Sequence, residues 1–212
     1  MAKNQMTQLI NQHLKNKKVK RLLIAPCGNG NDYKYLKQFG EEIYGIDIAS
    51  IATKQCPHNM IVKTADILES GYPDAYFDII ASPLFFHHYT INVGFNPFLK
   101  EFFRLLKPEG VLIILDFSVY YPIFSITRLV KKIFKNPLSE VEDEEPFRPK
   151  VMIDSLRRNG FVKVHLQGAT FNHNLFFIPL QKIINKITEP LLNKWPFKLF
   201  AFMVLFLAEK PI

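Results

Sequence analysis

A glycine-rich turn follows an apolar run near the start of the chain. Residues 22–32 read LLIAPCGNGND, and they hold Gly28 and Gly30, two of only nine glycines among 212 residues. Glycine accepts a positive φ and lets the backbone come close to a ligand. A strand that ends in such a turn usually leads into a helix. The stretch therefore predicts a ligand site lined by backbone at the end of a strand.

Two aspartates close later strand-like segments. Asp47 ends EIYGID and Asp66 ends MIVKTAD. A carboxylate in the position of Asp47 can accept hydrogen bonds from both hydroxyls of a ribose, as in dinucleotide-binding folds. An aspartate after a strand can also cap the helix that follows. For Asp66, both interpretations stay open.

Two neighbouring histidines, His87 and His88, lie in SPLFFHHY directly after another apolar segment. Imidazole is the most common general base in proteins, and this stretch is hydrophobic. We interpret His87 and His88 as a candidate base and its orienting group. The alternative is that one ring packs under the loop while the other is solvated.

Strand-like and helix-like segments alternate along the chain, which is typical of a parallel α/β sheet. Helices are expected at 8–14, 31–39, 48–55, 96–108 and 149–160, and strands at 20–25, 42–48, 60–67, 77–83, 111–117, 161–167 and 199–211. Asp32 falls in the first turn of the second helix, where a carboxylate suits the helix dipole. No internal repeat or low-complexity linker divides the chain, so a single domain is expected.

Composition excludes several classes of protein. Hydrophobic residues make up 48% and charged residues 22%, as in ordinary globular domains. Two cysteines, Cys27 and Cys56, form neither a disulfide framework nor a paired metal motif. The basic N-terminal segment has no apolar core of signal-peptide length, and the longest apolar run, 199–208, is about half of a bilayer span. We expect a cytoplasmic protein without metal.

The ordered series LLIAPCGNGND, IYGIDIAS, TADILE, FDIIASPLFFHH, FFRLLKPEGVLIILDF and FLAEKP resembles the motif set of class I S-adenosylmethionine-dependent methyltransferases. The resemblance covers nearly the whole chain. The PCG loop is similar to that of small-molecule members, namely the type 11 methyltransferase domain and the thiopurine type. A nicotinamide oxidoreductase fits less well, because its third glycine is replaced by Tyr33.

The resemblance implies a Rossmann-like seven-stranded sheet over residues 1–212, with helices on both faces and the last strand antiparallel. It places acceptor and lid insertions near 118–148 and 171–198. It implies S-adenosylmethionine as cofactor, with S-adenosylhomocysteine as product. Asp47 would hold the ribose, Ile48 and Ile67 the adenine, and Asp66 its amine. The full implied cofactor set is Ala25, Pro26, Cys27, Gly28, Gly30, Asp47, Ile48, Asp66, Ile67 and Ser82.

The glycine loop departs from the family pattern. Most members carry an acidic residue two positions before the first glycine, where this chain has Pro26. That position offers no carboxylate to the ammonium group of the cofactor. Three alternatives follow: backbone carbonyls and another side chain hold the ammonium group, the cofactor affinity is reduced, or the protein is catalytically silent.

The net charge of +8 indicates anionic partners, either nucleic acid or lipid. Ala81, Ser82, Pro83 and Leu84 do not match the Asn/Asp-Pro-Pro-aromatic motif of base-amino methyltransferases, and no RNA-binding module is recognisable. Lysines instead mark two apolar segments, 118–137 and 175–200, and the second contains Trp195. Such helices can lie on an anionic membrane, or they can simply cover the core.

We therefore predict methylation of a small, largely apolar acceptor, such as a lipid or an isoprenoid-like molecule. Phe85, Tyr120 and Tyr121 are candidate acceptor contacts. Peripheral contact with the inner membrane surface is an accompanying hypothesis. An RNA or protein methyltransferase and a silent scaffold stay open as alternatives.

Overall fold

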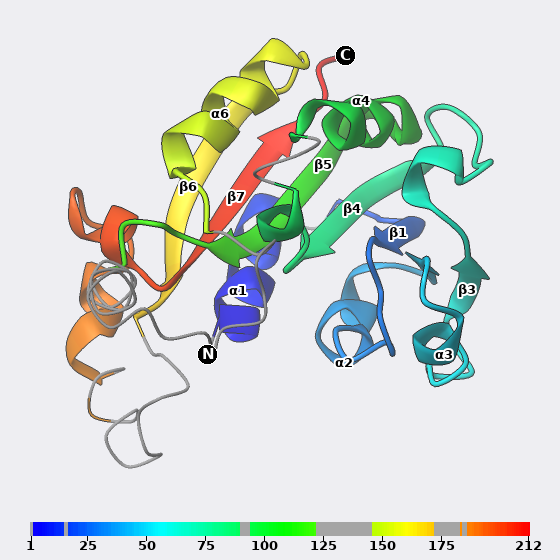
Figure 1. Ribbon diagram of the computed structural model, residues 1–212, viewed down its shortest axis with the longest axis horizontal. Helices are drawn as coiled ribbons and strands as arrows, with labels where there is room; N and C mark the ends of the chain where they lie inside the picture. The colour runs from blue at the N-terminus through cyan, green and yellow to red at the C-terminus, as the bar shows by residue number, and fades with distance from the viewer. Residues whose placement is uncertain (1, 15–16, 90–93, 122–145, 172–182, 184–185) are drawn as a thin grey trace, which may run out of the picture.

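The computed structural model describes residues 2–14, 17–89, 94–121, 146–171, 183 and 186–212 (Figure 1). The strands are β1 (Arg21–Ile24), β2 (Glu42–Asp47), β3 (Ile61–Thr64), β4 (Phe77–Pro83), β5 (Leu106–Phe117), β6 (Val162–Thr170) and β7 (Met203–Glu209). The α-helices are α1 (Ala2–Leu14), α2 (Tyr33–Leu36), α3 (Ser50–Thr53), α4 (Asn96–Leu105) and α6 (Pro149–Arg158). Short 3₁₀ turns occupy Lys37–Phe39, Ile67–Glu69, Phe86–His88, Glu189–Leu191 and Phe197–Phe200.

All seven strands form one sheet in the order β3-β2-β1-β4-β5-β7-β6. The pairs β1–β2, β2–β3, β1–β4 and β4–β5 are parallel. Strand β7 runs antiparallel to both β5 and β6. The expected seven-stranded sheet with an antiparallel last strand is confirmed.

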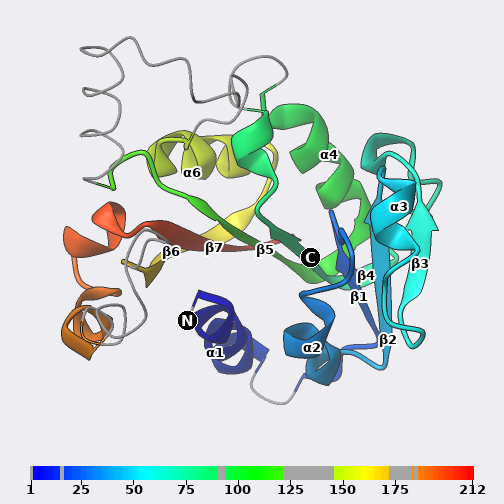
Figure 2. The same cartoon turned by 60° about the horizontal axis from the view of Figure 1, so that its bottom comes forward.

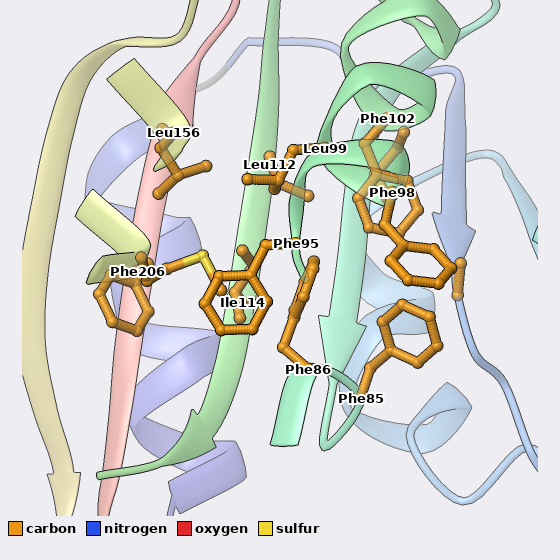
Figure 3. Close-up of a cluster of buried hydrophobic side chains, with 14 of the residues drawn as sticks. Phe85, Phe86, Phe95, Phe98, Leu99, Phe102, Leu112, Ile114, Leu156 and Phe206 are labelled. Carbon is orange, nitrogen blue, oxygen red and sulfur yellow. The ribbon is translucent and has the colours of Figure 1, made fainter. Parts of the chain in front are cut away.

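Helices cover both faces of the sheet. Neighbouring residues of a strand point to opposite faces, so a strand that is apolar throughout has side chains to bury on each face. Leu23 of β1 belongs to the cluster under α4 and α6, which Figure 3 shows in part. Leu22 and Ile24 belong to the cluster under α1 and α2 on the opposite face. Figure 2 shows the two layers of helices with the sheet between them. The expectation of helices on both faces is also confirmed.

Several element boundaries differ from the sequence-based prediction, and two of the differences have a clear physical reason. Helix α4 ends at Leu105 instead of continuing to Pro108, and β5 already begins at Leu106. The residue before a proline avoids the helical conformation, so Lys107 cannot extend the helix comfortably. The last strand begins at Met203 instead of Leu199, because Phe197–Phe200 form a 3₁₀ turn.

The predicted insertions fall largely outside the described residues. Of the segment 118–148 the structure describes 118–121 and 146–148, and of 171–198 it describes 171, 183 and 186–198. An acidic run, EVEDEE at residues 140–145, also lies outside the described residues. Among the described helices, none combines the length and the apolar character that a bilayer span requires.

The aromatic core of α4 provides a test of the packing. Phe102 is fully buried, and its ring centroid lies 6.2 Å from that of Phe86. We expect Phe102→Ala to lower the free energy of unfolding by about 3 to 5 kcal/mol, because it leaves a cavity in the core. The exposed Phe197 is the matched control, and Phe197→Ala should cost less than about 1 kcal/mol. Urea denaturation followed by circular dichroism measures both, and equal losses would contradict the assignment.

Candidate functional site

The candidate site lies at the carboxyl edge of the sheet, where the chain reverses its direction of strand addition. Strands β1, β2 and β3 are added toward one side, while β4 and β5 are added toward the other. Open α/β sheets bind ligands at this switch point. The glycine loop after β1 and the histidine turn after β4 therefore flank the place where a ligand is expected.

The glycine loop is fixed by backbone hydrogen bonds and by one side chain. The Cys27 N–H donates to the Ile46 carbonyl over 2.9 Å, and the Gly30 N–H donates to the Cys27 carbonyl over 2.9 Å. The Gly28 N–H donates to Asp47 Oδ2 over 2.7 Å. Gly28 and Gly30 adopt φ values of +50° and +77°, which side chains rarely accept. The predicted backbone-lined turn is thus present.

Asp47 connects this loop to the start of the next helix. While Oδ2 accepts from Gly28, Oδ1 accepts from the Ala49 N–H over 2.9 Å. An ionised carboxylate has about four lone-pair sites. Two of them remain for further donors, which is the number that a ribose diol brings.

A hollow opens beside Asp47. It encloses about 370 Å³, including its open mouth, and its lining consists of Pro26, Ile46, Asp47, Ile48, Ala65, Asp66, Ile67, Phe85 and Tyr89. Ile48 is 73% exposed on its rim, where a flat ring could cover it. Five of the ten predicted cofactor residues, Pro26, Asp47, Ile48, Asp66 and Ile67, are brought together here.

Asp66 caps the turn that follows it. Its Oδ1 accepts from the Leu68 N–H over 2.9 Å, so the helix-cap interpretation describes one of its oxygens. The side chain also lines the hollow. Its contact with an adenine amine stays a prediction.

Tyr89, which the sequence analysis missed, also lines the hollow. Burial raises the pKa of its phenol, and the negative charges of Asp66 and Asp47 raise the pKa further. The phenol therefore stays neutral and can act as a hydrogen-bond donor near two carboxylates. Its ring packs on Phe98 at 4.4 Å, which holds it in place. A single tyrosine after two histidines forms no recognisable motif, so the sequence did not indicate that Tyr89 lines a ligand site.

The other five predicted cofactor residues are not part of the lining: Gly28 and Gly30 form the loop described above, and Ala25, Cys27 and Ser82 are buried. Ala25 is buried, and its N–H donates to the Ala81 carbonyl over 2.9 Å. Cys27 is a buried free thiol, as expected, and burial raises its pKa. Ser82 is fully buried at the end of β4, and its Oγ has no hydrogen-bond partner within the described part of the chain.

The histidine turn holds a second buried aspartate. His87 Nδ1 lies 2.8 Å from Oδ1 of Asp116, and the two side chains are 7% and 0% exposed. His88 is exposed, and its ring packs against that of His87 with centroids 4.0 Å apart and an interplanar angle of 36°. Asp116 was missed by the sequence analysis. The available signal was a charged residue closing the apolar run VLIILD, which is the pattern that identified Asp47.

The three candidate acceptor contacts lie at different places. Phe85 lines the hollow itself, among the predicted cofactor residues. Tyr121 is buried, and its hydroxyl donates to the Phe171 carbonyl over 2.9 Å. Tyr120 is 38% exposed near Phe200. Their roles toward an acceptor stay predictions.

The residues of the hollow and of the glycine loop fit the chemical groups of S-adenosylmethionine. Among the described residues the buried Ser82 hydroxyl has no hydrogen-bond partner, which carries a free-energy cost unless water or a ligand satisfies it. A side chain added at Gly28 would meet no atom within 4 Å, so this part of the backbone is open to a ligand. Carboxylates, an apolar rim and open backbone are what a ribose, a purine and a charged amino-acid end require.

Comparison with known proteins gives the same class. A family model described as a methyltransferase domain matches residues 23–114. A S-adenosylmethionine-dependent methyltransferase from Archaeoglobus fulgidus superposes with a TM-score of 0.63 at 18% identity, over 98% of this chain and 94% of that one. An S-adenosylmethionine-dependent methyltransferase from Mesorhizobium loti superposes with a TM-score of 0.65 at 13% identity, over 99% of this chain and 98% of that one. None of the curated proteins matches the chain in sequence.

A third structure contains ligands. The phosphoethanolamine N-methyltransferase 2 of Haemonchus contortus, in complex with phosphomonomethylethanolamine and S-adenosylhomocysteine, gives a TM-score of 0.63 at 16% identity. The match covers 99% of this chain and 53% of that one.

The strand order defines a Rossmann-like class I methyltransferase fold. Within it, residues 23–114 match the family model of a methyltransferase domain.

The two loop glycines differ in the space around them, which gives a paired test. A Cβ on Gly30 would lie 2.5 Å from Cδ of the Pro57 ring, whereas a Cβ on Gly28 meets nothing within 4 Å. We expect Gly28→Ala to cost about 1 to 2 kcal/mol of unfolding free energy, for the left-handed conformation alone. Gly30→Ala should cost about 1 to 3 kcal/mol more because of the clash. Denaturation of both variants measures this, and equal losses would contradict the loop geometry.

Proposed function

We propose that the protein transfers a methyl group from S-adenosylmethionine to a small, largely apolar acceptor. The observation that carries the proposal is the hollow lined by Asp47, Asp66 and Ile48, at the switch point of a methyltransferase domain. The match to a methyltransferase of phosphomonomethylethanolamine supports an acceptor of small-molecule size.

Four residues of the hollow have a defined task in this proposal. Asp47 accepts from the ribose hydroxyls, Ile48 and Ile67 enclose the adenine, and Asp66 accepts from its amine through the oxygen that does not cap Leu68. S-adenosylmethionine, when bound, supplies a methyl group already activated by a positive sulfur. The protein therefore mainly aligns the acceptor and excludes water.

An apolar acceptor is supported by the side chains around the histidine turn. Phe85 packs against Tyr89 with ring centroids 4.9 Å apart, and Phe117 packs edge-on against His87 at 4.9 Å. Phe202 in turn contacts Phe117 at 5.1 Å. An aromatic wall of this kind favours an apolar body and excludes water from the transfer.

Binding of S-adenosylhomocysteine to Asp47 variants tests the proposal. We expect Asp47→Ala to weaken binding about tenfold to a hundredfold, because hydrogen bonds to a charged acceptor contribute about 1.5 to 3 kcal/mol each. Isothermal titration calorimetry measures the affinity. Asp78 is a matched control, since its carboxylate also accepts from two backbone amides, those of Lys20 and Arg21, at the opposite edge of the sheet.

Asp78→Ala should therefore lose stability without losing affinity for S-adenosylhomocysteine. Unchanged binding by Asp47→Ala would show the assignment to be wrong. Absence of binding by the wild-type protein would favour a silent scaffold instead.

We further propose that a surface on the segment 183–200 contacts anionic membrane from the cytoplasmic side and gives access to lipid-like acceptors. Large apolar side chains are exposed along it, with Trp195 at 72% and Ile187 at 66%. Ile183, Phe197 and Phe200 are exposed as well. Tryptophan and phenylalanine favour the interface between lipid and water.

The position and charge of this surface support the proposal. The connection from β6 to β7 leaves and re-enters the sheet at Thr170 and Met203, which pair with each other beside Phe117 at the carboxyl edge. Lys186 and Lys194 are exposed next to the apolar side chains, and Glu189 is the exposed acidic residue of the described part of this segment. Each lysine near an anionic surface contributes about 1 kcal/mol.

Vesicle co-sedimentation tests this surface. The triple variant Trp195→Ala, Phe197→Ala and Phe200→Ala should reduce the partition into phosphatidylglycerol-containing phosphatidylcholine vesicles by at least about tenfold. A matched control is Ile61→Ala with Val162→Ala, which removes exposed apolar side chains at the first residues of β3 and β6. This control should partition like the wild type. Wild-type protein that ignores these vesicles would refute membrane contact, and salt-sensitive RNA binding would favour the nucleic-acid alternative.

A further inference from the structure

We infer that Asp116 positions His87 as a proton acceptor, and that the methyl acceptor therefore carries a hydroxyl group. The inference rests on the proposed function and specifies the substrate class of the same site. It starts from a contact between two buried side chains, 29 residues apart in sequence, at the ends of neighbouring strands β4 and β5.

Asp116 is held by an unusually complete set of donors. Its Oδ2 accepts from the backbone N–H groups of Phe85, Phe86 and His87 over 3.2, 2.8 and 3.3 Å. Its Oδ1 accepts from the Phe117 N–H over 2.8 Å and faces His87 Nδ1 at 2.8 Å. The carboxylate can neither rotate nor move without breaking several of these bonds, so the side chain is rigid.

This arrangement fixes the tautomer of His87. A carboxylate is an acceptor only, so the proton of the contact belongs to Nδ1. The neutral ring then carries a lone pair on Nε2, which is the nitrogen able to take a proton. The rings of His88 and Phe117 pack on His87 at 4.0 and 4.9 Å and restrict its orientation.

The turn that carries His87 is built against the local backbone preference. Leu84 has a φ of +53°, although it is not glycine, and its N–H donates to the Leu115 carbonyl over 2.7 Å. Such a conformation costs about 1 kcal/mol or more and persists only where the surroundings enforce it. Here the surroundings are the Asp116 bonds to the next three residues.

The turn also links His87 to the cofactor hollow. Phe85 and Tyr89, which lie on either side of it in the turn, both line the hollow, whereas His87 contacts Asp116 of β5. His87 is thus two residues away in sequence from each of these two lining residues, and its ring packs against Phe117, which in turn contacts Phe202.

A hydroxyl is the acceptor group that needs this arrangement. Amines and thiols can lose their proton to water before transfer, but an alcohol or a phenol keeps its proton until the new bond forms. The acceptor oxygen forms the O–CH₃ bond as the S–CH₃ bond breaks with its electron pair on sulfur, and the hydroxyl proton goes to His87 Nε2 and later to water. Asp116 has its lone pairs occupied by donors, so it offers no free oxygen to an ammonium acceptor.

The tautomer can be measured without activity. Heteronuclear NMR of the ring nitrogens in the wild-type protein, loaded with S-adenosylhomocysteine and assigned with His87→Gln, should show that the neutral ring carries its proton on Nδ1 and not on Nε2. Asp116→Asn should shift the proton toward Nε2, because an amide can present its NH₂ group to Nδ1. A proton on Nε2 of the neutral wild-type ring would overturn the inference.

Three acceptors with one apolar body test the substrate class. We expect transfer from radiolabelled S-adenosylmethionine to para-octylphenol to exceed transfer to para-octylaniline and para-octylthiophenol. His87→Gln should lower transfer to the phenol by about 10²- to 10⁴-fold, and Asp116→Asn by tenfold or more, with unchanged affinity for S-adenosylhomocysteine. The exposed His58 is a matched control, and His58→Gln should keep the wild-type rate.

The outcomes separate this inference from the proposed function. Preference for the aniline or the thiol, transfer to none of the three, or a phenol rate insensitive to His87→Gln would each overturn the hydroxyl assignment. Methyl transfer to another probe, or binding of S-adenosylhomocysteine, would leave the cofactor site intact in those cases. Because Asp116→Asn removes an acceptor from the core, its folding is checked by thermal denaturation, and His87→Gln carries the test if it unfolds.

Discussion

Two aspartates at the ends of strands determine the shape of the carboxyl edge. In a parallel sheet, the loops beyond the strands have backbone N–H groups without strand partners. Asp47 of β2 accepts from Gly28, in the loop after β1. Asp116 of β5 accepts from Phe85, Phe86 and His87, in the turn after β4. Each carboxylate ties its own strand to the loop of the neighbouring strand, one on either side of the switch point.

This arrangement prepares the site before any ligand binds. Both loops are held by short bonds to buried or half-buried carboxylates, so little conformational entropy remains to be lost on binding. A carboxylate also binds the backbone at the opposite edge of the sheet, where Asp78 accepts from the Arg21 N–H over 2.8 Å and forms an ion pair with Lys107. There it serves stability, because Lys107 occupies one carboxylate oxygen. At the carboxyl edge, Asp47 keeps lone pairs available.

The sequence predicted the sheet better than the contacts between its ends. Alternation of apolar residues was sufficient for the approximate positions of the strands, because it depends on local periodicity, and the family resemblance implied seven strands with the last one antiparallel. Asp47 followed from its spacing to the glycine turn. Asp116 did not, since its partners lie about 30 residues earlier and its burial depends on the β4–β5 pairing. The α4–β5 boundary was also wrong, because strand pairing of Leu106 with Phe77 competes with helix extension. The pair His87 and His88 could not be told apart by sequence, because burial distinguishes them.

The departure of the glycine loop from the family pattern has a physical explanation. Pro26 replaces an acidic residue and has no N–H, so the loop has one donor less to satisfy. Pro26 lines the same hollow as Asp47 and Asp66, and a third carboxylate there would add repulsion between like charges. Asp47 already accepts a hydrogen bond from the Gly28 N–H, so the loop stays attached to the sheet without an acidic residue at position 26. Two carboxylates then remain in the hollow to attract a positively charged cofactor, while the proline limits the freedom of the loop.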